Sequence, residues 1–331
     1  MSPSIDSSDG ETGSFRLLSR EGAEKALDRL RESRPDLWAA PRRRGCLRGI
    51  DVFSAQGLPD AFRGACNNFR AAHGRFPALI NPQTTADHWF TVKFFHDIPL
   101  RPINPADKLT SPLFMSEETR RQVGYPDRVW ISEEPRLPGD DEVPPGDYWL
   151  KISNASAMQT RLRWPPSPEE REVLLGKIEK WWPKNFGLVW GEWWYSLCKR
   201  RIYLETDVST RMAGRPEVKI FVRDGVPKLL YAIRLRDDGR HEQAYFDADL
   251  NRLEGRSPPN LPLEDELPDT IELMLRGAAE IGRRFRVCRI DFLNLAGGQP
   301  GFGEITICHN NARKNLSPAG FDDWARQLLF E

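Results

Sequence analysis

Two acidic residues near the C-terminal end of the chain are spaced so that a β-hairpin would bring them face to face. Residues 287–295 and 302–308 are apolar, β-branched runs with polar residues at alternate positions, and Gly297-Gly298 between them is a two-residue hairpin signal. If these glycines form the centre of the turn, Asp291 and Glu304 lie opposite each other, about 5 Å apart at Cβ. Two carboxylates at that distance repel unless a cation lies between them, and oxygen donors suit a Mg²⁺ ion that bridges a nucleotide phosphate. The spacing therefore predicts a magnesium site on one face of the hairpin.

Arg289 shares this face with Asp291, because the side chains of a strand alternate with a period of two. Two other interpretations fit the same pattern. Alternating charge is common on a solvated hairpin face, and Gly301 or Gly303 could shift the register through a bulge. The spacing alone leaves both alternatives open, so the residues upstream have to decide between them.

The elements that would position this hairpin begin with an N-terminal part that contains at least one helix. Residues 1–14 are rich in Ser, Gly and Asp with few apolar groups, and we expect a disordered tail there. Ser19 can cap a helix that runs to about Ser33. Four aromatic residues farther along predict a packed helix or a pair of strands: Trp89, Phe90, Phe94 and Phe95.

The rest of the chain alternates strands, turns and helices. Asp224-Gly225 predicts a second hairpin between residues 217–223 and 226–235, and the polar, Pro-rich residues 237–267 predict a loop with little secondary structure. The other expected elements are a linker at 136–147, a strand from Tyr148 to Ser153, a helix from Glu169 to Trp182, a strand from Arg201 to Glu205 and a helix that Pro268 opens. Hairpins mixed with helices predict an α+β fold and not a doubly wound parallel sheet.

The composition excludes several classes of protein. The 331 residues suffice for one large domain or two to three packed ones, and 48 basic residues balance 48 acidic ones, which favours neither nucleic acid nor anionic lipid as a partner. The five cysteines show no C-x-x-C spacing, so we expect neither a disulfide framework nor a zinc site. No apolar run reaches the roughly 18–20 residues of a membrane span, and the N-terminus lacks the core of a signal peptide. A cytoplasmic protein without a membrane span is therefore expected.

The order of these elements resembles the nucleotide-binding half of the ATP-grasp superfamily. More narrowly, six fragments in order resemble the TupA-like ATP-grasp family: W-x-x-x-N-F-G (181–187), G-E-W-W-Y (191–195), R-I-Y-L-E (201–205), V-K-I-F-V-R-D-G-V-P-K (218–228), R-I-D-F-L (289–293) and F-G-E-I-T (302–306). Asp107-Lys108 in P-A-D-K-L also fits the N-terminal region of that family, and the resemblance covers roughly residues 75–330. It implies an ATP-grasp fold of two α+β subdomains at 126–331, preceded by a smaller N-terminal region at 15–125.

The resemblance also implies an ATP site. Lys151 matches the lysine that contacts ATP phosphates, although a strand lysine taken alone is more often a solvated edge residue. Glu205 matches the glutamate that accepts a hydrogen bond from the adenine amino group. The other residues that the resemblance assigns to ATP are Thr206 and Val208 along the adenine edge, Glu217 at the ribose hydroxyls, Lys219 at a phosphate and Leu293 packed on the adenine.

The same resemblance assigns roles on the hairpin. Asp291 and Glu304 match the magnesium ligands, and Arg289 matches an arginine that faces the reacting carboxyl group. The usual third ligand of the superfamily is an asparagine two residues after the glutamate. This chain has Thr306 there, which could ligate through its hydroxyl group or be replaced by water. The loop after Lys151 also lacks glycine, which puts the geometry of that loop in doubt more than nucleotide binding.

The segment after the hairpin is expected to border the substrate. It contains His309, Asn311 and Arg313, and its cations suit a carboxylate-bearing molecule. A solvated polar loop explains the same residues equally well.

The resemblance implies an ATP- and Mg²⁺-dependent carboxylate–amine ligase that forms an amide through an acyl phosphate. Its substrates would be a small-molecule carboxylate and an amine, such as an amino acid, a peptide or a uronic acid, in the biosynthesis of a cell-surface polymer or a secondary metabolite. Two alternatives stay open: a small-molecule or sugar kinase with the same fold, and a nucleotide-binding regulatory protein without turnover. The aromatic content permits a homo-oligomer without requiring one.

Overall fold

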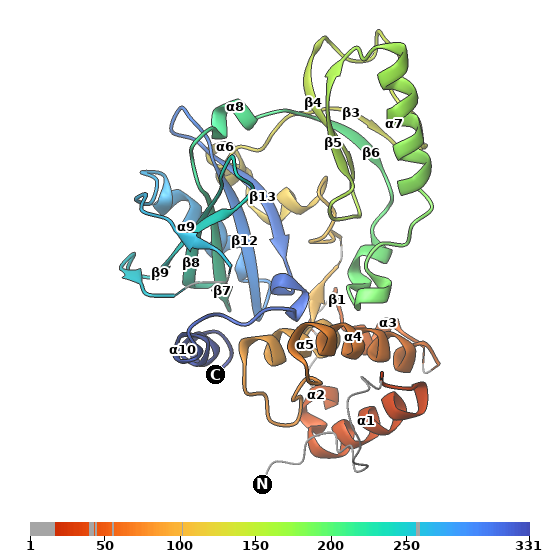
Figure 1. The fold of residues 1–331 in the computed structure, drawn as a ribbon, viewed down its shortest axis with the longest axis vertical. Helices are drawn as coiled ribbons and strands as arrows, with labels where there is room; N and C mark the ends of the chain where they lie inside the picture. The colour runs from red at the N-terminus through yellow and green to blue at the C-terminus, as the bar shows by residue number, and fades with distance from the viewer. Residues whose placement is uncertain (1–16, 40–42, 44, 55, 101, 256–258) are drawn as a thin grey trace.

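The computed structural model describes residues 17–39, 43, 45–54, 56–100, 102–255 and 259–331 (Figure 1). The tail predicted at residues 1–14 lies outside this range. The described residues form a helical N-terminal part and two larger sheets, and in Figure 1 the N-terminal helices lie below both sheets. None of the described helices is long and apolar enough to cross a membrane.

The N-terminal part is built from amphipathic helices. Ser19 caps the first helix, as predicted, by accepting a hydrogen bond from the backbone of Gly22, and one helix face buries Ala23, Leu27 and Leu30. The elements are α1 (Arg20–Ser33), α2 (Pro35–Ala39), α3 (Gly49–Val52), α4 (Gly57–His73) and α5 (Thr85–Phe95), with β1 (Cys46–Leu47) paired to β2 (Ile98–Pro99).

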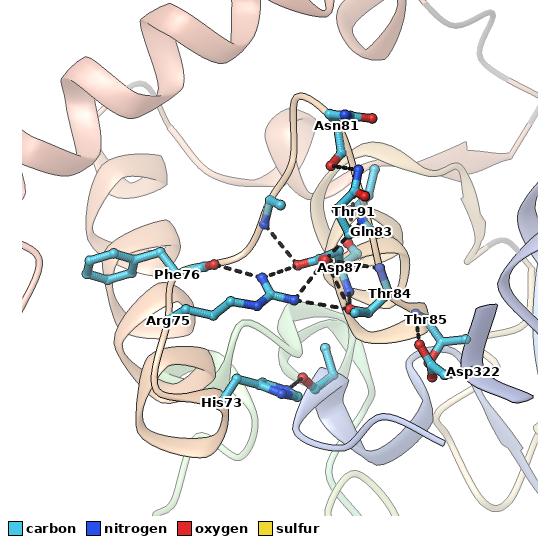
Figure 2. A network of polar contacts seen from close by, with 12 residues as sticks. His73, Arg75, Phe76, Asn81, Gln83, Thr84, Thr85, Asp87, Thr91 and Asp322 are labelled. Carbon is cyan, nitrogen blue, oxygen red and sulfur yellow. Dashed lines mark hydrogen bonds and ion pairs between the residues drawn. The ribbon is translucent and has the colours of Figure 1, made fainter. Parts of the chain in front are cut away.

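The four aromatic residues at 89–95 belong to helix α5 and not to a pair of strands. This helix is buried on nearly all sides. Its N-terminus is fixed by two buried carboxylates (Figure 2). Asp87 accepts from both terminal nitrogens of Arg75 at 2.9 and 3.0 Å and from the hydroxyl of Thr84 at 3.0 Å. Asp322, on the C-terminal helix, accepts from the backbone and hydroxyl of Thr85 at 3.0 and 2.5 Å. The bonds of Asp322 join α10 to α5.

The smaller sheet has four antiparallel strands in the order β3-β6-β4-β5. Its strands are β3 (Arg128–Ser132), β4 (Gly146–Ile152), β5 (Gln159–Trp164) and β6 (Ile202–Thr206). Helix α7 (Pro168–Trp181) packs Leu174 and Ile178 against Leu150 and Leu204 on one face. By the alternation of strand side chains, Lys151 and Glu205 belong to the opposite face.

The larger sheet has seven strands, with the path β10-β9-β8-β7-β12-β13 and β11 beside β9. Its strands are β7 (Glu217–Arg223), β8 (Val226–Leu235), β9 (His241–Asp247), β10 (Arg252–Leu253), β11 (Leu261–Pro262), β12 (Val287–Asn294) and β13 (Pro300–Thr306). The loop predicted at 237–267 is wrong, because this range contains the buried strand β9 and the short strands β10 and β11. Strand β9 has no alternation to reveal it, since both of its faces are covered: Tyr245 packs in one core and Ala244 in the other.

Each face of the larger sheet has its own cover. Helix α9 (Ile271–Gly282) packs Met274, Ala278 and Ile281 on the face of Ile290. The other face carries Phe221 and joins one continuous apolar core with the N-terminal helices and α10 (Ala319–Phe330). The remaining elements are η1 (Ser111–Phe114), α6 (Glu117–Gln122), η2 (Leu188–Trp190), η3 (Trp193–Leu197), α8 (Ser209–Met212) and η4 (His309–Ala312). The division proposed at residues 125/126 stays a prediction.

The predicted hairpin forms, and Asp291 pairs with Glu304 as expected, but by another route. Asn294 pairs with Pro300, so the loop is residues 295–299 and its centre is Gly297 alone. That register would place Asp291 opposite Gly303. A bulge at Gly303 shifts it by one residue and brings Glu304 opposite Asp291. A Cβ atom at residue 303 would lie 2.9 Å from the carbonyl oxygen of Asp291, so the bulge requires glycine there.

Candidate active site

The centre of the hairpin face is a buried ion cluster. The guanidinium of Arg289 donates to both carboxylate oxygens of Asp291, from Nε and Nη2, at 2.7 Å each. On the neighbouring strand β7, Lys219 pairs with Asp291 in register and its Nζ donates to Asp291 Oδ2 at 2.7 Å and to Glu217 Oε2 at 2.9 Å. Four of the predicted residues therefore form one hydrogen-bonded group.

The charges of this group stabilise one another against the cost of burial. Burial disfavours the charged form of Asp291, but Arg289 and Lys219 outweigh it and lower the pKa of this carboxyl to about 2. Burial likewise opposes the charge of Lys219, and the carboxylates of Asp291 and Glu217 reverse that effect and raise the pKa of the ammonium group. Arg289, Lys219 and Asp291 are therefore ionised at neutral pH.

Glu304 faces Asp291 across the strand pair and is partly exposed. It has neither an ion pair nor a side-chain hydrogen bond within the part of the chain that the structure describes. An ionised carboxylate accepts about four hydrogen bonds, and Asp291 uses three of these positions. The two side chains together can thus offer oxygen atoms to a hard cation such as Mg²⁺, which usually takes only one or two carboxylates when nucleotide phosphates supply further oxygens. No group of three or more His, Cys, Asp or Glu that could hold a metal alone occurs among the described residues.

Thr306 and His309 contact the same arginine. Arg289 Nη2 donates to the hydroxyl oxygen of Thr306 at 3.0 Å, so this oxygen has one lone pair fewer for a metal. Arg289 Nη1 lies 2.6 Å from Nδ1 of His309. Burial lowers the pKa of His309 well below its usual value, and the charge of Arg289 adds to this effect. His309 is therefore neutral, and because a guanidinium can only donate, Nδ1 is the acceptor and the proton lies on Nε2. The amide of Asn310, whose Nδ2 is placed 3.0 Å from Nε2, must then turn its oxygen toward this N–H.

The turn that carries His309 has an unusual backbone. Asn310, Asn311 and Ala312 have φ values of 48°, 53° and 58°, in the left-handed region that side chains disfavour. Two side chains of the N-terminal helices hold this turn: Lys93 Nζ donates to Asn311 O at 3.1 Å, and His73 Nε2 lies 2.9 Å from Ala312 O. Such strain persists only where the surrounding structure fixes it, and it concentrates at functional sites.

The other two predicted substrate residues lie apart from the ion cluster. Asn311 is bound through its backbone to Lys93, and its side-chain oxygen is buried without a hydrogen-bond partner. Arg313 is exposed and lies over the ring of Trp190, 5.4 Å from its centroid. Neither side chain hydrogen-bonds with Arg289 or Asp291 in the described structure, so His309 is the member of this segment that the structure brings to the hairpin.

The smaller sheet supplies a second charged group. Lys151 and Glu205 lie diagonally on β4 and β6 and form an ion pair, and Arg128 Nε lies 3.8 Å from the other oxygen of Glu205. Thr206 ends β6, and Val208, two residues later, is the N-cap of α8. Both are partly exposed where the chain leaves the smaller sheet for the larger one. Leu293 is also partly exposed, next to Gly301 and two residues from Asp291 on β12.

Lys108 lies between the two charged groups, and only the P-A-D-K-L fragment pointed to it in the sequence. Its ammonium bonds to the carbonyl of Ala155, in the loop after Lys151. Burial lowers the pKa of Lys108, the charge of Glu304 opposes this effect, and the charge of Lys151 adds to it. Lys108 thus interacts electrostatically with Glu304 of the larger sheet and with Lys151 of the smaller sheet. It therefore connects the charged residues of both sheets.

Two further residues, Glu192 and Tyr195, interact electrostatically with Glu304 of the hairpin. The charges of Glu304 and Lys93 act on Glu192, and those of Glu304, Glu192 and Arg289 act on Tyr195. Both residues lie in the aromatic G-E-W-W-Y segment. Trp193 and Trp194 of the same segment are nearly fully buried.

Comparisons with known proteins agree with this geometry. The model of the family described as TupA-like ATPgrasp matches residues 171–329, from within α7 to near the end of α10. The match includes Glu205, the larger sheet and the hairpin, and it begins after Lys108 and Lys151. No curated protein sequence matches the chain.

Several solved structures resemble the chain at low identity. The D-alanine–D-alanine ligase from Bacillus anthracis complexed with ATP shares 15% identity with a TM-score of 0.36, over 62% of this chain and 56% of that one. The ATP-grasp ligase PsnB complexed with precursor peptide PsnA2 and AMPPNP shares 15% identity with a TM-score of 0.36, over 67% of this chain and 57% of that one. The D-alanyl-alanine synthetase A from Vibrio cholerae O1 biovar eltor str. N16961 shares 13% identity with a TM-score of 0.34, over 63% of this chain and 56% of that one.

The chain spans little more than half the length of these solved structures. Its two sheets, each covered by a helix, form an α+β ATP-grasp fold. Residues 171–329, just under half of the chain, match the TupA-like ATP-grasp family.

Proposed function

We propose that the protein is an ATP- and Mg²⁺-dependent ligase that joins a carboxylate to an amine through an acyl phosphate. The observation that carries this proposal is the arrangement on the hairpin: a buried arginine held by Asp291, with Glu304 unpaired opposite it among the described residues. A protein that only binds a nucleotide has no need for a buried guanidinium beside its metal ligands. The family match over the same strands supports the nucleotide as ATP.

The charged residues of the two sheets would bind both ends of ATP, the adenine and the phosphates. Glu205 would turn from Lys151 to the adenine amino group, and Lys151 would turn to a phosphate, so each exchanges its present partner for the nucleotide. Lys108 and Lys219 would add positive charge at the phosphates. Thr206, Val208 and Leu293 would line the adenine, and Glu217 would accept from the ribose hydroxyl groups.

Asp291 and Glu304 would hold Mg²⁺, with Thr306 as a weaker third candidate because Arg289 already bonds to its hydroxyl. When bound, the ion would neutralise charge on the phosphates during phosphoryl transfer. Burial beside Arg289 and Lys219 keeps Asp291 ionised, which suits a ligand of a divalent cation.

Arg289 would bind the reacting carboxyl group. Its guanidinium is held in place by Asp291, Thr306 and neutral His309, so it is oriented before the substrate arrives. In the first step the substrate carboxylate attacks the γ-phosphorus and ADP leaves. In the second step the amine nitrogen forms a bond to the carbonyl carbon, the C–O bond to phosphate breaks and the ammonium proton is released. Arg289 would stabilise the oxyanion that exists after the amine attacks and before phosphate leaves. His309, together with Asn311 and Arg313, would border the substrate.

The substrates belong to the same proposal. A small carboxylate such as an amino acid, a peptide or a uronic acid suits the cations of the site, and the pathway would be that of a cell-surface polymer or a secondary metabolite. The chain's formation of ADP should be measured with panels of carboxylates, each with and without amines, and the products identified by mass spectrometry. A ligase gives an amide and needs the amine, whereas a kinase gives a phosphorylated product without it.

Arg289→Lys provides the matched variant, because lysine keeps the charge but loses the fork of donors. Loss of one oxyanion donor costs about 3–4 kcal/mol, so we expect kcat to fall by about 10² to 10³. If none of the tested pairs of carboxylate and amine leads to ADP formation, the ligase proposal is contradicted.

A further inference from the structure

The segment between α7 and β6 is anchored on the N-terminal helices. Trp193 is fully buried, and its indole Nε1 donates to Lys93 O at 2.5 Å. Asn104 Nδ2 donates to Trp194 O at 2.9 Å, and a Cβ atom at Gly191 would lie 3.1 Å from the ring of Phe94. These contacts leave the segment little freedom to move relative to α5.

Two polar side chains of the segment have no hydrogen-bond or ion-pair partner among the described residues. A Cβ atom at Gly187 would lie 2.5 Å from Glu192 O and 3.1 Å from both Glu192 Cβ and Tyr195 Cδ2, so Glu192 and Tyr195 lie side by side over this glycine. Both are partly buried. In the described structure, neither the carboxyl group of Glu192 nor the hydroxyl group of Tyr195 has a hydrogen bond or an ion pair, and neither is fully enclosed.

Lys93 joins this segment to the turn after the hairpin, since its Nζ donates to Trp190 O and to Asn311 O at 3.1 Å each, and this brings Glu192 and Tyr195 toward the hairpin. Glu304 acts electrostatically on both, and Arg289 acts on Tyr195. Burial raises the pKa of Glu192 to about 7 against the opposing charge of Lys93, and Glu304 raises it further. In its ionised form this carboxyl group would be stabilised by a further cation beside Lys93.

The missing cation is more consistent with an organic ammonium than with a metal. The described residues contain no cluster of three or more His, Cys, Asp or Glu that could hold a metal. The Tyr195 ring lies beside Glu192 and in a T-shaped contact with Phe186, and an aromatic ring attracts an ammonium group in addition to the carboxylate. A reacting amine must arrive on the side of the carbonyl carbon, which Arg289 would hold.

We propose that Glu192 binds the ammonium group of the acceptor amine, with the Tyr195 ring beside it. This inference rests on the proposed ligase function and names a residue that selects its second substrate. It adds no covalent step, because Glu192 only positions the amine before the proton is lost. A carboxylate in this position selects amines that are protonated in solution, such as amino acids and primary alkylamines.

The test uses hydroxylamine, a nucleophile that is largely uncharged at neutral pH and needs no carboxylate to bind it. Wild type is incubated with ATP, Mg²⁺ and a pool of amino acids and uronic acids, with or without hydroxylamine. Amides are measured by mass spectrometry and hydroxamates by their iron(III) colour. In Glu192→Gln we expect amide formation to fall at least about tenfold, as for a lost charged hydrogen bond, with hydroxamate formation within about threefold of wild type.

Two further variants keep the test sharp. Glu192→Asp retains the charge and should keep more amide formation than Glu192→Gln, and Glu179→Gln, exposed on α7, should change neither product. If wild type forms neither product, the ligase proposal falls and this one with it. If wild type forms both and Glu192→Gln either keeps both or loses both alike, the ligase proposal stands and the role of Glu192 is wrong.

Discussion

Arg289 and Asp291, two residues apart on β12, form a bidentate ion pair with both N–O distances at 2.7 Å. The residue proposed to stabilise the oxyanion and the residue proposed to bind Mg²⁺ are thus one unit. Lys219 joins the same carboxylate, and the side chains of the pair are 9% and 5% exposed. A change at Asp291 should therefore affect both the free energy of unfolding and the proposed reaction. A change at Glu304, which has no ion pair among the described residues, should affect only the reaction.

This coupling predicts different stabilities for the two carboxylate variants. Asp291→Asn removes the charge that balances Arg289 and Lys219, and breaking a buried pair in this way costs about 3–5 kcal/mol. Glu304→Gln should change the free energy of unfolding by less than about 1 kcal/mol, as for an exposed charge. Urea denaturation of both variants measures the difference, and equal losses would contradict it.

His309 is predicted to act through Arg289. His309→Leu leaves Nη1 of the guanidinium without its acceptor, which costs about 1–3 kcal/mol of stability and lowers kcat more than it changes nucleotide affinity. His309→Gln supplies an oxygen acceptor and should recover part of both losses. His241→Leu, exposed at the start of β9, is the control that should behave as wild type. A full loss of nucleotide binding in His309→Leu would place this histidine at ATP instead.

Lys93 should hold the left-handed turn. Lys93→Met keeps the length of the side chain but leaves Asn311 O and Trp190 O without this donor, at a cost of about 1–3 kcal/mol. Hydrogen exchange should accelerate over residues 308–316, while the affinity for an ATP analogue stays unchanged because Lys93 contacts neither Lys151 nor Glu205. The exposed Lys180→Met on α7 is the control. Unchanged exchange in Lys93→Met would mean that the turn is stable by itself.

The protein should lose stability when the pH falls below about 6.5. Burial lowers the pKa of His88 to about 4 and that of His96 to about 3, against an unfolded value of 6.5. Between these values the unfolded chain binds more protons than the folded one, so the free energy of unfolding decreases as the pH decreases. Denaturant midpoints at pH 7.5 and 5.0 measure the effect, and replacing both histidines with phenylalanine should reduce it. An unchanged pH dependence in the double variant would assign the effect to other groups.

The sequence predicted the elements whose patterns are local. The α1 cap at Ser19, the hairpin at Asp224-Gly225 and the pairing of Asp291 with Glu304 follow from residue types a few positions apart. The pairing was predicted from a turn centred between two glycines, and it is correct only because a bulge at Gly303 compensates for a turn centred on Gly297. Alternation alone cannot place a bulge.

Other features depend on contacts between distant segments and had no local signal. Strand β9 is buried on both faces, so its residues do not alternate. The neutral His309 and the ion cluster on Asp291 depend on strands β7, β12 and β13 meeting in register. Lys108, Glu192 and Tyr195 reach the site only through packing of the N-terminal helices, which periodicity does not describe.

The most direct test of the central claim is a thermal-shift titration with AMP-PNP and Mg²⁺ on wild type and Glu304→Gln. Glu304→Gln is the better variant because its expected stability matches wild type, so a lost response reports the site and not the fold. At a hundred times its Kd a ligand stabilises the folded state by about 2.7 kcal/mol. The proposal predicts a shift in wild type that requires Mg²⁺ and is lost in Glu304→Gln. A wild-type protein that shows no shift, or one that does not depend on Mg²⁺ or on Glu304, would contradict it.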